Sequence, residues 1–262
     1  MTYSPNVPSH LVPSQLGAGQ SVAYRTAARP RTRAMARPYN IAWLTPDGEE
    51  RYDTVVAPAL PVIESACASM ARGAIVSTAN GPVAVEDLSP GMMISTSEYG
   101  PIPLQWIGSY EMSLREAQTA DRGALFRVTS DAFGLAKPSP DLLLAPRAHI
   151  LFRHAKCRAL FGVDLAFAPV RAFEDGETIF SVQPASPIAV FNLGFDRQAT
   201  IKVNGIELES FHPGPHTEAL IDEEMKYSLL RLFPQARGLD FFGPQLINRL
   251  TTFEVRALRE GS

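Results

Sequence analysis

Residues 73–92 read GAIVSTANGPVAVEDLSPGM, and this stretch contains the pattern that decides the fold. Two short runs of strand-forming residues, 74–77 and 82–85, lie on either side of Asn80-Gly81. An Asn-Gly dipeptide between such runs is a strong signal for a β-hairpin, because both residues tolerate the positive φ angles of a tight turn. The stretch therefore predicts short antiparallel strands rather than a helix.

The same pattern continues from Gly73 to Glu209. Further short apolar runs, separated by turn residues, occupy 92–95, 104–107, 125–128, 178–182, 188–191, 200–203 and 206–208. The last two runs form a second hairpin pattern on Asn204-Gly205. Strands at this spacing, with little helical periodicity between them, predict a mainly β protein with a closed or highly curved sheet.

Both ends of the chain differ from this central part. Residues 1–38 contain no acidic residue and are rich in Pro, Ser, Ala and Arg, so we expect a disordered basic arm. Residues 39–68 predict one short strand followed by a linker. Near the C-terminus, apolar residues at helical spacing follow the acids at 222–224, and Thr251 with Glu254 matches a capping box. We therefore expect a helical extension over 215–262.

The composition excludes several classes of function. The chain has 262 residues, a net charge of −3 and a mean hydropathy of −0.02, with no apolar run long enough for a membrane span. This balance gives no sign of a nucleic-acid partner. The sequence also lacks phosphate-binding and dinucleotide-binding glycine motifs, so we expect no cofactor and identify no small-molecule ligand.

Two cysteines, Cys67 and Cys157, are too few for a disulfide framework and favour a reducing compartment. The N-terminal residues lack the pattern of a secretory signal peptide. The expected location is therefore cytoplasmic, and export by a non-classical route remains open.

Five segments, in order along the chain, resemble the bacterial Hint family, which is related to Hedgehog and intein modules. They are the opening SMARGAIV at 69–76, GPVAVEDLSPGM at 81–92, LQWIG at 104–108, DLLLAP at 141–146 and ESFHPG at 209–214. The resemblance implies a curved, horseshoe-like, all-β Hint domain over 69–214, followed by the helical extension.

The resemblance also implies a self-cleavage chemistry. In this family a Cys or Ser at the first position of the domain attacks the preceding carbonyl and forms a thioester or ester. A Thr/Ser-x-x-His motif hydrogen-bonds the scissile amide and protonates its departing nitrogen, because an amine does not leave as an anion. A second nucleophile then resolves the intermediate, and inteins finish through a penultimate His and a terminal Asn.

This chain departs from the family pattern at each of these points. Ser69 holds the nucleophile position and would form an ester with the carbonyl of Ala68. Ala145 and Ala148 occupy the positions of the Thr/Ser and the His. His149 is the neighbour, and in a strand it would point to the opposite face unless a bulge or a one-residue slip intervened. In addition, no histidine of the chain is followed by Asn.

Cys67 lies two residues before Ser69. It is either a displaced nucleophile or a small buried cysteine.

Three functions remain open. We favour a Hint-fold protein that does not splice and acts as an interaction or structural module, with a protein partner that the sequence does not identify. The alternative is autocatalytic cleavage at Ala68-Ser69 by Ser69 and His149, which would act on the chain itself and not on other substrates.

The third possibility is a metal-binding module built from histidines and one cysteine. Its ligands would be His149, His154 and Cys157, with His212 or His216 as a fourth. We expect no metal, because the spacing matches no recognised zinc site and cationic residues surround it.

Overall fold

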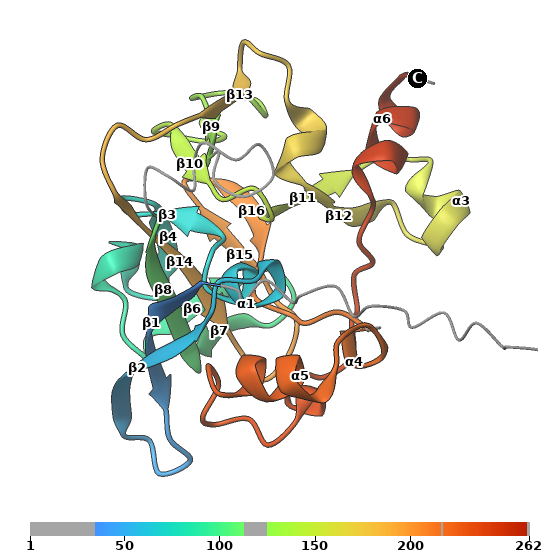
Figure 1. Ribbon diagram of the computed structural model, residues 1–262. Coiled ribbons are helices and arrows are strands. Elements are labelled where there is room, and N and C mark those ends of the chain that lie inside the picture. Colours follow the sequence, from blue (N-terminus) through green and yellow to red (C-terminus); the bar gives the residue numbers. More distant parts are fainter. Residues whose placement is uncertain (1–34, 113–124, 216, 261–262) are drawn as a thin grey trace, which may run out of the picture. The chain divides into compact units, whose positions relative to one another are not determined.

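The computed structural model describes residues 35–112, 125–215 and 217–260 (Figure 1). Most of the expected basic arm, residues 1–34, lies outside the described residues. The first sheet has eight antiparallel strands in the order β13-β9-β10-β3-β14-β8-β1-β2. Its strands are β1 (Ala36–Leu44), β2 (Glu50–Pro58), β3 (Met70–Ala71), β8 (Trp106–Met112), β9 (Leu125–Val128), β10 (Leu142–Leu144), β13 (Ile179–Val182) and β14 (Ile188–Gly194).

The second sheet is built around the two Asn-Gly hairpins, as predicted. Its order is β12-β11-β16-β15-β4-β6-β7, with β5 paired to β4. In the second hairpin Asn204 and Gly205 have φ angles of 48° and 88°, which only a few residue types adopt without strain. The strands are β4 (Ile75–Thr78), β5 (Gly81–Ala84), β6 (Met93–Thr96), β7 (Gly100–Pro103), β11 (His149–Arg153), β12 (Leu165–Pro169), β15 (Thr200–Val203) and β16 (Ile206–Glu209).

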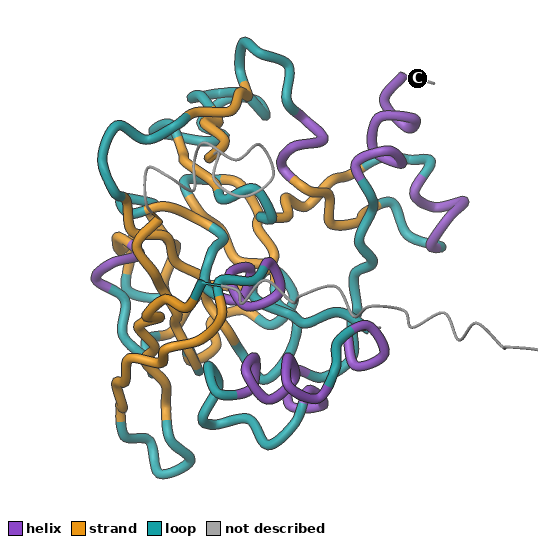
Figure 2. Tube along the Cα trace, viewed as in Figure 1, coloured by secondary structure: helices purple, strands orange, loops and turns teal. Residues whose placement is uncertain are grey.

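The predicted C-terminal helices are confirmed. Asp222 accepts a hydrogen bond from the backbone of Met225 at the start of α5, and Thr251 and Glu254 form the predicted capping box before α6. Figure 2 shows strands dominating as far as β16, with the two longest described helices after it. The helical segments are α1 (Pro61–Ala66), η1 (Val85–Asp87), α3 (Cys157–Phe161), η2 (Val170–Phe173), α4 (Thr217–Leu220), α5 (Glu223–Leu230), η3 (Leu239–Phe242) and α6 (Thr252–Glu260). None of these helices has the length and apolarity needed to cross a membrane.

The segment expected to be a linker is mostly regular structure. Strand β2 pairs with β1 over nine residue pairs, and α1 follows it. The mostly exposed side chains of β2 give no apolar alternation, so its strand conformation comes from pairing with β1 rather than from its own pattern. Strand β1 also includes residues 36–38, which were expected in the arm, and Arg37 pairs there with Glu64 at 3.0 Å.

The C-terminal extension is joined to the β core through Trp106. This side chain is fully buried, its indole nitrogen donates a hydrogen bond of 2.6 Å to the carbonyl of Leu232, and its ring lies 4.2 Å from that of Phe233. A methyl group on Gly108 would lie 2.1 Å from the Trp106 ring, so the glycine of the LQWIG segment is required by packing. Trp106 is therefore a packing residue of the core.

Candidate functional site

A cavity of about 350 Å³ is lined by three of the positions that the sequence singled out, Ser69, Ala148 and His149, and Ala145 is not among its lining residues. Its walls come from both sheets and from the C-terminal extension. The polar lining residues are Ser65, Ser69, Arg147, His149, Asn192, Glu209, Ser210, His212, Thr217 and Arg249. The apolar ones are Pro61, Val62, Ala68, Ala148, Phe211, Pro213 and Leu229.

Ser69 is held by its backbone and leaves its hydroxyl unused. Its amide donates to the carbonyl of Phe191 at 2.8 Å, and its carbonyl accepts from the amide of Ala145 at 2.8 Å. The residue is 3% exposed, and its Oγ has no hydrogen-bond partner among the described residues. No base therefore contacts this hydroxyl, although activation by a base is what a serine nucleophile needs.

Ala145 and Ala148 are both buried, and they carry methyl groups where the resemblance implies a hydroxyl and an imidazole. They belong to a tight turn in which the amide of Ala148 donates to the carbonyl of Ala145 at 3.0 Å. The carbonyl of Ala148 then accepts from the amide of Val170 at 2.9 Å. Neither side chain can donate or accept a proton.

His149 lies on the same cavity wall as Ala148. Strand alternation does not separate the two residues, because β11 begins only at His149 and the turn precedes it. The ring nitrogen Nδ1 lies 3.2 Å from Oε2 of Glu209. The imidazole is therefore close to a carboxylate, and no hydrogen bond joins it to the Ser69 hydroxyl.

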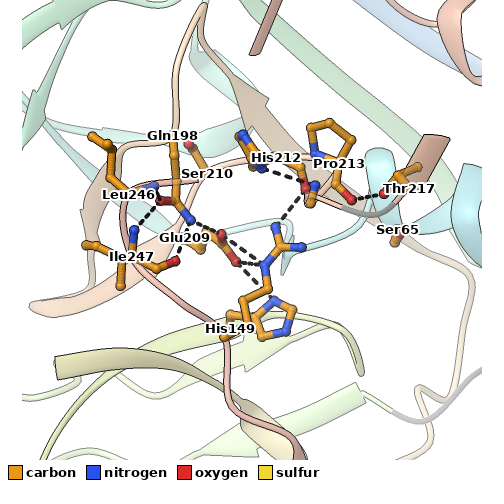
Figure 3. Close-up of polar contacts among 12 residues, drawn as sticks. Ser65, His149, Gln198, Glu209, Ser210, His212, Pro213, Thr217, Leu246 and Ile247 are labelled. Carbon is orange, nitrogen blue, oxygen red and sulfur yellow. Dashed lines mark hydrogen bonds and ion pairs between the residues drawn. The ribbon is translucent and has the colours of Figure 1, made fainter. Parts of the chain in front are cut away.

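Glu209 is the centre of a buried polar network (Figure 3). Nε of Arg249 donates to both of its oxygens, at 3.0 and 2.8 Å, and Nε2 of Gln198 donates to Oε1 at 2.6 Å. Arg249 also donates to the carbonyl of His212 at 2.7 Å. Because Arg249 lies in the C-terminal extension, this network fastens the extension to the end of β16.

The Gln198 side chain adds a second connection to the extension. Its Oε1 accepts from the amides of Leu246 and Ile247 at 2.9 and 2.8 Å.

The surroundings of His149 keep its imidazole neutral. Burial, together with the guanidinium groups of Arg249 and Arg147, lowers the pKa of His149 to about 3. Burial raises the pKa of Glu209, and Arg249 opposes that rise. The distance alone would allow an ion pair between His149 and Glu209. Arg249 already balances the carboxylate, so the contact does not require a protonated imidazole.

An imidazole with so low a pKa is a poor proton donor at neutral pH and a weak base.

Cys67 is fully buried in the apolar core and does not line the cavity. Burial raises the pKa of its thiol far above the ordinary value, so the thiolate that a nucleophile requires is suppressed. Of the two interpretations of this residue, the structure supports the buried cysteine. Cys157 is also a free, buried thiol.

Those residues considered as metal ligands that the structure describes form no group that could hold a metal. Within the described ranges, no three His, Cys, Asp or Glu side chains are placed so that they could hold a metal. His154 stacks on Phe152 with ring centroids 5.5 Å apart. His212 uses both ring nitrogens, one with the carbonyl of Gly243 and one with the amide of Gly214. His216 lies outside the described residues.

Sequence reasoning missed most of this network. Glu209 opens the ESFHPG segment, but nothing in that motif indicated an ion pair. Gln198 and Arg249 are 11 and 40 residues away from it, and no local pattern marks either one. Only the fold brings them together.

Two antiparallel sheets, with a cavity at Ser69, define a mainly β module. The family model described as "Hint domain" matches residues 68–215, which is more than half of the chain. The chain belongs to the Hint domain family.

Two solved structures are similar to part of the chain. The bacterial intein-like domain from Clostridium thermocellum is 12% identical, with a TM-score of 0.38 over 55% of this chain and 99% of that one. The AceL NrdHF class 3 split intein, solved as a splice-inactive variant, is 8% identical, with a TM-score of 0.38 over 54% of this chain and 96% of that one. A comparison with curated proteins finds no match.

Proposed function

We propose that this chain is a Hint-fold module that neither splices nor cleaves itself and that serves as a structural or binding module. The observation that carries the proposal is the unpartnered hydroxyl of Ser69, together with the methyl groups of Ala145 and Ala148 at the positions of the family's Thr/Ser and His. Attack on the carbonyl of Ala68 needs a base for the hydroxyl and an acid for the departing nitrogen. Neither is in place.

The alternative, cleavage at Ala68-Ser69, is favoured only by the presence of Ser69 and His149 in one cavity. A neutral imidazole with a pKa of about 3 argues against it, because protonated His149 is rare at neutral pH. In addition, Nδ1 of His149 lies 3.2 Å from Oε2 of Glu209, and no hydrogen bond joins the ring to the Ser69 hydroxyl. A module that does not cleave itself therefore fits the geometry better than cleavage at Ala68-Ser69 does.

Intact mass of freshly expressed protein tests the proposal. We expect the full chain of 28.5 kDa to persist with and without hydroxylamine or dithiothreitol, and Ser69→Ala to behave identically. A fragment beginning at Ser69 that disappears in Ser69→Ala would refute the proposal and establish self-cleavage.

A restoration experiment tests the physical reason. The triple variant Ser69→Cys/Ala145→Thr/Ala148→His returns the family's residues to these three positions, of which 69 and 148 line the cavity. We expect this variant to cleave before residue 69 when hydroxylamine is added. A control with Asn in place of His at 148 has a similar size but no imidazole, and should remain intact.

A further inference from the structure

We propose that the exposed edge of β2 pairs with the same edge of a second copy of this chain, so that two molecules join their first sheets around a two-fold axis. The free part of the edge is the segment 50–54, in which every side chain is exposed. This inference gives the proposed binding role a partner. It rests on that proposal, because cleavage at Ala68-Ser69 would cut the chain between β2 and the β domain.

The backbone groups of β2 point alternately toward β1 and away from it. The amide of Thr45 donates to the carbonyl of Glu49 at 2.9 Å, in register with the β1–β2 pairs. Because hydrogen-bonded pairs alternate along an antiparallel ladder, odd-numbered residues of β2 face β1 and even-numbered ones face outward. The carbonyl of Val56 agrees with this direction, since it accepts from Nη1 of Arg231 at 3.5 Å. The outward groups before it belong to Glu50, Tyr52 and Thr54.

The other strands at the ends of the sheets carry features that block the addition of a strand. β12 is covered by the C-terminal extension, through a bridge between Phe167 and Arg249. β5, β7 and β13 have four residues each, and β5 and β7 contain prolines, which cannot donate to a ladder. β2 has nine residues with proline only at its last position, and among the described residues it pairs with β1 alone. Such an edge is a template for another strand.

The charges of this edge favour a second copy as the added strand. When two β2 edges pair antiparallel with Tyr52 opposite Tyr52, Arg51 of each copy lies opposite Asp53 of the other. Positions 51 and 53 then form a non-hydrogen-bonded pair, in which facing side chains are closest. Moving the two-fold axis by one residue would instead place Arg51 opposite Arg51, or Asp53 opposite Asp53. The edge is therefore complementary to itself when Tyr52 lies on the axis.

The groups that this pairing needs have weak partners within the chain. Arg51 pairs with Glu49 at 2.5 Å, but their side chains are 59% and 62% exposed, and such a surface ion pair contributes little. The amide of Thr54 donates to Oδ1 of Asp53 at 2.7 Å. In the dimer this amide would donate to the carbonyl of Glu50 in the second copy, which frees the Asp53 carboxylate for Arg51.

Sedimentation equilibrium of the full chain, from about 10 µM to about 1 mM, tests the proposal. The free edge is short, so the pairing buries less than the roughly 1,200 Å² of a specific, stable interface. We therefore expect a reversible dimer with a Kd on the order of 100 µM.

Charge reversal tests the register. Arg51→Asp makes both cross-strand pairs acidic and Asp53→Arg makes both basic, so each variant should dimerise at least about tenfold more weakly than the wild type. An equimolar mixture of the two variants restores opposite charges in both pairs and should form the mixed dimer. The double variant Arg51→Asp/Asp53→Arg should dimerise with itself for the same reason. The matched control is Arg237→Asp, which changes the net charge equally at an exposed position outside β2 and should dimerise as the wild type does.

The backbone provides a second readout. The outward amide of Tyr52 should exchange its hydrogen more slowly as the protein concentration rises, because the second copy accepts from it. Tyr52→Pro removes this donor without removing a hydrogen bond to β1, and should abolish the dimer while circular dichroism remains that of the wild type.

Several results would overturn the inference. These are a monomer at about 1 mM, a dimer that Arg51→Asp or Tyr52→Pro leaves unchanged, or a mixture of the two charge variants that stays monomeric. Binding of an unrelated extended peptide along β2 of a monomeric protein would assign the edge to another occupant. Intact mass of every sample reports cleavage separately. Failure of the dimer therefore leaves the uncleaved module standing, and a fragment beginning at Ser69 refutes that module whatever pairs with β2.

Discussion

Removing the charge of Glu209 should cost a large part of the stability of this protein. The carboxylate is 2% exposed and accepts hydrogen bonds from Arg249 and Gln198. Glu209→Gln keeps the shape of the side chain but leaves the Arg249 guanidinium without a counter-charge. The NH₂ group that the substitution introduces would also face the N–H donors of Arg249 and Gln198, and two donors cannot hydrogen-bond to each other. Breaking a buried ion pair costs about 3–5 kcal/mol.

Because the Arg249 side chain is 24% exposed, water can solvate part of its charge. We therefore expect Glu209→Gln to lower the free energy of unfolding by about 3 kcal/mol, the lower end of that range. The total free energy of unfolding of such a protein should be about 5–15 kcal/mol.

The matched control lies two residues earlier on the same strand. Glu207 pairs with Arg153, but the Arg153 side chain is 56% exposed. Such a surface pair contributes at most about 1 kcal/mol, so Glu207→Gln should change stability little. Urea denaturation, followed by tryptophan fluorescence from Trp43 and the buried Trp106, measures both variants.

A double-mutant cycle then tests the cause. Glu209→Gln/Arg249→Met removes both charges, and it should be less destabilised than the sum of the two single variants. If Glu209→Gln lies within about 1 kcal/mol of the wild type, or if the two substitutions are additive, the network does not hold the extension as argued.

Three further predictions concern other parts of the molecule. Because the pKa of His149 is about 3 in the folded state, against an ordinary value of 6.5, the unfolded chain binds more protons between these limits. Stability should therefore fall with decreasing pH by up to about 1.4 kcal/mol per unit, and His149→Asn should remove this part of the slope in acid denaturation. Gly108→Ala should destabilise by about 3 kcal/mol in urea, since its methyl group would overlap Trp106, and a change below about 1 kcal/mol would contradict the packing. Cys67 and Cys157 should react with a thiol reagent only on unfolding, and rapid labelling of either in native protein would show that it is accessible.

Several elements followed from local sequence because local chemistry decides them. The Asn204-Gly205 turn requires two positive φ angles, and few other dipeptides allow both. The capping box before α6 forms between Thr251 and Glu254, only three residues apart. In both cases the groups that interact are neighbours in the chain, so the pattern is readable without the fold.

The sequence by itself also showed what the site lacks. Ala145 and Ala148 stand at the positions where the family resemblance implies a Thr/Ser and a His, and a methyl group cannot transfer a proton in any fold. Absence of a functional group is a property of the residue and does not depend on its surroundings.

Tertiary structure alone decided what surrounds these positions. The nine-residue pairing of β2 with β1 overrides a sequence that predicted a linker. Arg249 reaches Glu209 only because the chain returns to β16 after the helical extension, and burial between these elements lowers the pKa of His149. A hydrogen bond between residues 40 apart depends on how the sheets and the extension pack, and desolvation depends on every neighbour. Neither quantity is encoded in a local pattern.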